Sequence, residues 1–98
     1  MKKDILLKAI TTYGPENQLL QATEECAEFI QAVNKYRRTK TEAQVIEARL
    51  HLAEEIADCF IMLEQATIIV GGESLVNHWK QKKLDRLAKR LEEEEQNE

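Results

Sequence analysis

The chain has 98 residues, 33% of them charged, with only three glycines and one proline. This composition predicts a single all-α domain over residues 1–98. The net charge of −4 argues against nucleic acid as a partner. No run approaches the roughly 20 apolar residues that cross a bilayer, and the first residues lack a signal-peptide pattern. We therefore expect a cytoplasmic protein without membrane contact, in which Cys26 and Cys59 stay reduced.

Glycine, proline and capping residues divide the chain into four expected helices, over about residues 4–13, 15–38, 42–70 and 74–93. The breaks are Gly14-Pro15, the polar stretch "RRTKTE" and Gly71-Gly72, and the candidate N-caps are Asp4, Thr41 and Ser74. The acidic end, about residues 92–98, is expected to fray. We predict a four-helix-bundle-like chain with two long antiparallel central helices. Because one core of this size is thin, we expect it to assemble into a dimeric or tetrameric bundle.

The two long central segments carry the same acidic pattern. "ATEECAEF" contains Glu24, Glu25 and Glu28, and "LAEEIADCF" contains Glu54, Glu55 and Asp58 at a constant shift of thirty positions. On a helical wheel, an apolar stripe begins about 40° from Glu25 in one segment and about 40° from Glu55 in the other. If the two stripes pack together, four carboxylates lie along one edge of the contact: Glu25, Glu28, Glu55 and Asp58.

Four converging carboxylates repel one another, so they must take up protons or hold a cation between them. Hard divalent cations such as Mg²⁺ prefer oxygen ligands, and the pattern therefore predicts a metal site. The plain alternative is a solvated acidic helix face with partners one turn away. A di-iron site is disfavoured, because neither His51 nor His78 follows a Glu at the Glu-x-x-His spacing.

These residues resemble a known family, the all-α nucleoside triphosphate pyrophosphohydrolases. The first motif, EExxE, reads Glu24-Glu25-Cys26-Ala27-Glu28, and the second, ExxD, reads Glu55-Ile56-Ala57-Asp58. Together with "YGPENQLLQATEECAEFIQAVNKYRR" and "KQKKLDRLAKRL", they are similar to the short, phage-type MazG-like branch over about residues 10–91. The chain departs from the pattern in its long polar linker between the motifs and in Cys26, where a hydrophobic residue is usual.

The resemblance implies Mg²⁺-dependent hydrolysis of a nucleoside triphosphate to a monophosphate and pyrophosphate, with Mn²⁺ able to substitute for Mg²⁺, and a role in cleaning the nucleotide pool. It makes Glu25, Glu28, Glu55 and Asp58 the metal ligands. Glu24 and Glu25 are the candidate catalytic residues, Glu24 either supporting a ligand or orienting the attacking water. The expected assembly is a homodimer or homotetramer. Two alternatives stay open: a phosphoribosyl-ATP pyrophosphohydrolase, which shares the acidic pattern, and a non-catalytic helical interaction protein.

Cations must offset the acids if a phosphate chain is to bind, and the fourth helix offers Lys83 and Arg86 on one strip with Trp79. We expect Lys83 and Arg86 to contact the β and γ phosphates, the alternative being a basic surface face. Trp79, Gln18 and Gln21 are candidates for contacts with the nucleotide, although Trp79 also suits a core or interface position. A second basic group, Lys35, Arg37 and Arg38, is explained by the end of the second helix.

Overall fold

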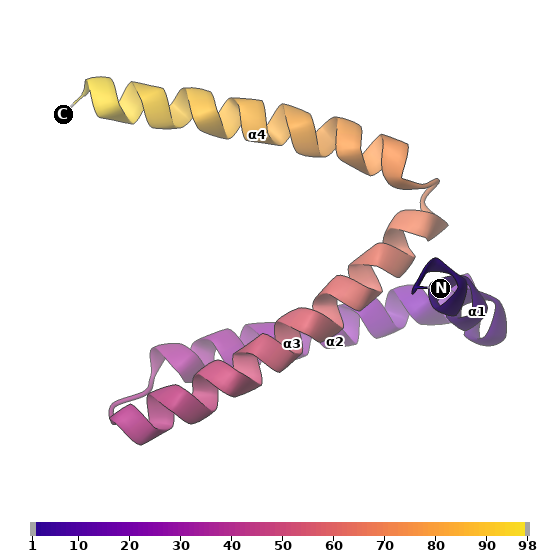
Figure 1. Ribbon diagram of the computed structural model, residues 1–98, viewed down its shortest axis with the longest axis horizontal. Coiled ribbons are helices and arrows are strands. Elements are labelled where there is room, and N and C mark those ends of the chain that lie inside the picture. The colour runs from indigo at the N-terminus through magenta and orange to yellow at the C-terminus, as the bar shows by residue number, and fades with distance from the viewer. Residues whose placement is uncertain (1, 98) are drawn as a thin grey trace.

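The computed structural model describes residues 2–97 and is helical almost throughout (Figure 1). Its elements are α1 (Lys2–Tyr13), α2 (Pro15–Arg37), α3 (Glu42–Ile69) and α4 (Glu73–Gln96). No strand occurs within the described range. The predicted all-α class is therefore confirmed, and the breaks lie at the glycines and at the polar stretch, as expected.

Local capping explains where α3 begins and corrects two predicted caps. Thr41 Oγ1 accepts a hydrogen bond from the Gln44 backbone N–H, and Gln44 Oε1 accepts one from the Thr41 N–H, which is a complete capping box. The predicted caps Asp4 and Ser74 are wrong, because α1 already begins at Lys2 and α4 follows Gly72 directly. Both residues lie inside the first helical turn. At the other end, α4 continues past the expected boundary to Gln96.

Helices α2 and α3 lie side by side and form the main packed unit (Figure 1). Gln18, near the start of α2, donates to Gln65, near the end of α3, over 2.7 Å. Cys59 donates to the backbone carbonyl of Glu25 over 3.4 Å. The order of contacts is thus opposite along the two helices. Small and flexible side chains fill the space between them, and the buried apolar members are Ala32, Ala48, Cys59 and Met62.

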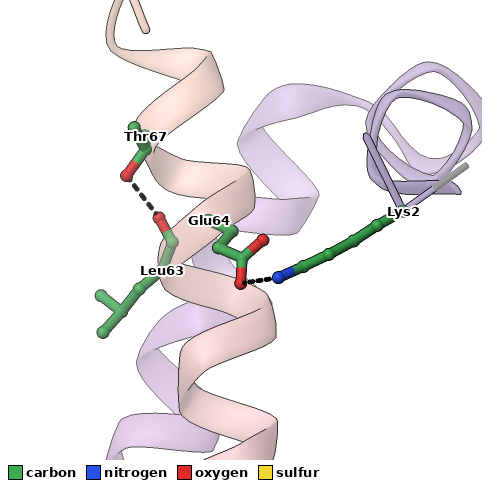
Figure 2. A network of polar contacts seen from close by, with 4 residues as sticks. All are labelled: Lys2, Leu63, Glu64 and Thr67. Atoms are coloured by element: carbon green, nitrogen blue, oxygen red, sulfur yellow. Dashed lines mark hydrogen bonds and ion pairs between the residues drawn. The ribbon is translucent and has the colours of Figure 1, made fainter. Parts of the chain in front are cut away.

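Helix α1 covers one end of this pair. Its Leu6 is buried, and its Lys2 reaches Glu64 of α3 across 2.9 Å (Figure 2). Both charged side chains remain substantially exposed, at 75% and 40%, so the ion pair adds little stability and the packing of Leu6 holds α1. In the same view, the Thr67 hydroxyl donates to the Leu63 carbonyl within α3.

Helix α4 leaves the rest of the chain. The axis bends by 115° between α3 and α4, at Gly71 and Gly72, whose φ angles of 127° and 107° are reached at low cost only by glycine. Of the other helices α4 contacts α3 alone, and none of its described residues is buried (Figure 1). Residues 2–97 of one chain therefore do not close into a four-helix bundle, in contrast to the expected bundle-like chain.

The consequence is an extended molecule. The radius of gyration is 17.4 Å, against about 13 Å for a compact domain of this length. Across residues 2–97, no single helix has both the length and the apolar character to cross a membrane, although the bent α3 and α4 pass that test together on length and composition alone.

Candidate metal centre

Three carboxylates meet where the middle of α2 faces the middle of α3. Glu25 and Glu28 stand three residues apart on α2, so they share one face of the helix, and Glu55 faces them from α3. One carboxylate oxygen from each lies within 4.8 Å of the other two. The predicted convergence of these three acids is confirmed. Metal binding by them stays a prediction.

Two oxygens of this cluster are buried without a hydrogen-bond donor. Glu55 is only 7% exposed, and its Oε2 has no partner, and the same holds for Oε2 of the half-buried Glu25. The other Glu25 oxygen accepts from Gln21 Nε2 over 3.0 Å, and His51 Nε2 lies 4.0 Å from Glu55 Oε1. Buried polar atoms are nearly always paired in folded proteins. Two neighbouring carboxylates that each keep an unpaired buried oxygen could hold a cation.

Electrostatics agrees with this geometry. Burial raises the pKa of the Glu55 carboxyl, and the neighbouring charges of Glu28, Asp58 and Glu25 raise it further, while His51 acts in the opposite direction. A cation would relieve this repulsion between carboxylates. Asp58 is half-buried and does not belong to the group of three, but its charge is felt by Glu55.

The thiols of Cys26 and Cys59 lie close to each other, and Cys59 lies close to Glu25 and Glu55. Burial raises the pKa of the Cys59 thiol, and Cys26 raises it further through its charge and a side-chain hydrogen bond. Cys59 also donates to the Glu25 carbonyl. Both cysteines are free, and the Cys59 hydrogen bond ties the backbone that carries Glu25 to α3.

The remaining predicted site residues are dispersed. Glu24 is exposed beside the cluster. Gln21 donates to Glu25 within α2, and Gln18 is buried and donates to Gln65 of α3. The α4 candidates are all exposed, and within one chain α4 does not contact α2 and does not bring them to the acids. These are Trp79, Lys83 and Arg86.

Sequence reasoning gave little weight to His51. It precedes Glu55 by four residues, which on a helix places the two side chains on one face, and this spacing was the available signal. Gln21 stands four residues before Glu25 and donates to that carboxylate, and its contact with a nucleotide stays a prediction.

Neither the protein-family models, nor the curated proteins, nor the solved structures contain a match to this chain. Any assignment of function therefore rests on the geometry of the site. A compact group of carboxylates, partly buried and short of donors, could bind a metal cation.

Proposed function

We propose that the chain is a Mg²⁺-dependent hydrolase that converts a nucleoside triphosphate to a nucleoside monophosphate and pyrophosphate. One observation carries the proposal: Glu25 and Glu55, each with a buried oxygen that has no donor among the described residues, form one cluster with the Glu28 carboxylate. An interaction scaffold has no physical reason to keep such acids, because removing them would relieve repulsion and desolvation at no loss.

The residues present fit the cation. Carboxylate oxygens are the ligands that Mg²⁺ and Mn²⁺ prefer, and Glu25, Glu28 and Glu55 would hold the ion, with Asp58 adding negative charge nearby. The bound ion would neutralise phosphate oxygens and lower the pKa of a water molecule. Gln21 holds Glu25 in place. Glu24, outside the group and exposed, is the carboxylate to which we assign acceptance of the water proton.

The sequence supports the same reaction. The order EExxE, then ExxD on the next long helix, then a basic last helix is similar to the MazG-like nucleotide pyrophosphohydrolases. Phosphoribosyl-ATP is the competing substrate, since the acidic motifs suit both reactions, and a direct assay separates the two.

We further propose that the chain works as a homodimer or homotetramer in which α2 and α3 run antiparallel, as their order of contacts favours. The accessible surface is 8210 Å², whereas a compact monomer of this mass exposes about 5,800 Å². The difference, roughly 2,400 Å² per chain, exceeds the ~800 Å² that a standard interface buries on each partner.

The exposed apolar side chains indicate where the copies meet. Glu28 lies three residues after Glu25, and Asp58 three residues after Glu55, so both turn to the same side of their helices. Ile56 lies one residue after Glu55, about 100° round the helix in the opposite direction. Because contacts run in opposite order along α2 and α3, both apolar rows turn to one side of the pair, away from Glu28 and Asp58. We name this side the apolar face; its exposed members are Leu19, Ile30, Ile56, Phe60 and Leu63.

The test is pyrophosphate release from a panel of canonical and modified ribo- and deoxynucleoside triphosphates and phosphoribosyl-ATP, with Mg²⁺ or with EDTA. We expect release that requires Mg²⁺ and that Glu55→Gln abolishes. The matched control is Glu54→Gln, since Glu54 is the exposed neighbour outside the cluster. Activity that survives Glu55→Gln, or no release from any substrate by a folded protein, contradicts the proposal.

A further inference from the structure

A cavity of about 550 Å³ opens at the end of the α2–α3 pair, where the two helices are joined. This volume lies within the range of small-molecule sites. Its wall includes Lys35 from the last turn of α2, Arg38 directly after α2, and Gln44, Glu47 and His51 from the start of α3. The cavity therefore combines two cationic side chains with amide and imidazole groups, and one carboxylate.

The cavity and the acidic cluster lie along the same faces of α2 and α3. Lys35 follows Glu28 by seven residues, two helical turns, so the two side chains share one face of α2 about 10 Å apart along the axis. On α3, Glu47, His51 and Glu55 follow each other at four-residue steps on one face. His51 belongs to both places: it lines the cavity, and its Nε2 is 4.0 Å from Glu55 Oε1.

The donors in the cavity are not used by the protein. Within residues 2–97, neither Lys35 nor Arg38 takes part in an ion pair. Gln44 uses its Oε1 to accept from the backbone N–H groups of Lys40 and Thr41, which leaves its NH₂ group as a donor toward the cavity. Glu47 offsets part of the positive charge. An arginine fork and a lysine ammonium beside an amide donor form a suitable environment for phosphate oxygens.

We propose that this cavity binds the pyrophosphate end of the nucleotide, its β and γ phosphoryl groups, while the α phosphate lies at the acidic cluster. The inference rests on the proposed function, and it assigns the role first expected of Lys83 and Arg86 to Lys35 and Arg38. Those α4 residues stay away from the acids within one chain, whereas Lys35 and Arg38 line a cavity whose wall includes His51, the neighbour of Glu55.

The chemistry explains why cations are needed there. In the hydrolysis, the water oxygen bonds to the α phosphorus while the bond from that phosphorus to the bridging oxygen breaks. The bridging oxygen keeps the electron pair and leaves with pyrophosphate, and the water proton passes to a carboxylate. Negative charge therefore grows on the leaving group, and cations at the cavity stabilise it more in the transition state than in the substrate.

The first experiment measures binding of inorganic pyrophosphate by calorimetry in EDTA. We expect Arg38→Ala and Lys35→Ala each to weaken binding about tenfold or more, since hydrogen bonds to charged groups contribute roughly 1.5–3 kcal/mol. Arg38→Lys keeps the charge but loses the fork, and it should recover only part of the affinity. Arg37→Ala is the matched control, because Arg37 is exposed, adjacent and outside the cavity wall, and it should change affinity less than twofold.

A second arm measures binding of a nucleoside monophosphate with Mg²⁺, which lacks the pyrophosphate end. Glu55→Gln should remove this binding and Arg38→Ala should not. Pyrophosphate affinity that is indifferent to both Lys35→Ala and Arg38→Ala overturns the inference, as does a loss seen only in Lys83→Ala and Arg86→Ala. Arg38-dependent pyrophosphate binding by a protein that hydrolyses no nucleotide would leave the anion site standing and refute the proposed reaction instead. Circular dichroism of each variant controls for folding.

Discussion

Replacing Phe60 by Asp should separate the copies of this chain without unfolding each one. Phe60 is 61% exposed in the single chain, and an aromatic side chain buries roughly 150–250 Å². About 120 Å² is thus available for association, which at about 25 cal/mol per Å² contributes roughly 3 kcal/mol per copy. In a two-fold dimer the side chain is lost twice, about 6 kcal/mol in all, so we expect the dissociation constant to rise by about 10⁴.

Sedimentation equilibrium over a range of concentrations measures this directly. The wild-type chain should sediment as a dimer or tetramer, and Phe60→Asp as a monomer at concentrations where the wild type is fully assembled. Leu50→Asp is the matched control, since Leu50 lies on the same helix, is 68% exposed and is not on the apolar face. A wild type that stays monomeric, or an assembly that tolerates Phe60→Asp and Leu50→Asp equally, would refute the reasoning from exposed area.

Thr41→Ala removes the capping box of α3 and should lower the free energy of unfolding by about 1 kcal/mol in urea titrations, whereas Thr23→Ala on an exposed helix face should change it by less than about 0.5 kcal/mol. In EDTA, the raised pKa of Glu55 means that the folded chain holds this proton more tightly than the unfolded chain. Stability from this group is therefore fully present below about pH 4.3, the ordinary Glu value, and is lost as the pH rises through the higher folded-state pKa; thermal melts should show this fall, and Glu55→Gln should flatten it. Iodoacetamide should modify Cys26 before Cys59 at neutral pH, because Cys59 is buried with a raised pKa; mass spectrometry that finds the reverse order would contradict the packing described.

Glycine, proline and capping residues in the sequence were enough to predict the breaks between the helices. Gly14-Pro15, the Thr41 cap and Gly71-Gly72 each act within a few residues, so the breaks follow from local chemistry. Two caps failed for the same reason: Asp4 and Ser74 were chosen as capping residue types, but the helices begin earlier, at Lys2 and directly after Gly72. The local sequence is compatible with either start of the helix. The exact end residues of a helix are therefore harder to predict than the breaks between helices.

The convergence of Glu25, Glu28 and Glu55 was also predictable, since helical period and a repeated motif fix which faces meet. The basic residues that we propose to bind phosphate were not predictable in the same way. The helical period places Lys83 on one strip of α4, but it does not show which part of the molecule that strip faces. Helix α4 turns away from the acids at the glycines. Lys35 and Arg38 were explained by the helix end alone, although the seven-residue step from Glu28 to Lys35 already placed Lys35 on the face of the acids.

The outward course of α4 also governs how the protein reaches its native state. Helices α2 and α3 are joined by a short connection and pair with each other, so this unit has mostly local contacts and should form rapidly in each chain. The apolar side chains of α4, such as Leu84, Leu87 and Leu91, are exposed and find no cover among residues 2–97 of their own chain. If a second chain covers them, their burial is a bimolecular event whose rate falls on dilution. Refolding should then show a fast phase that is independent of concentration and a slower one that is not, and the midpoint of thermal unfolding should rise with protein concentration.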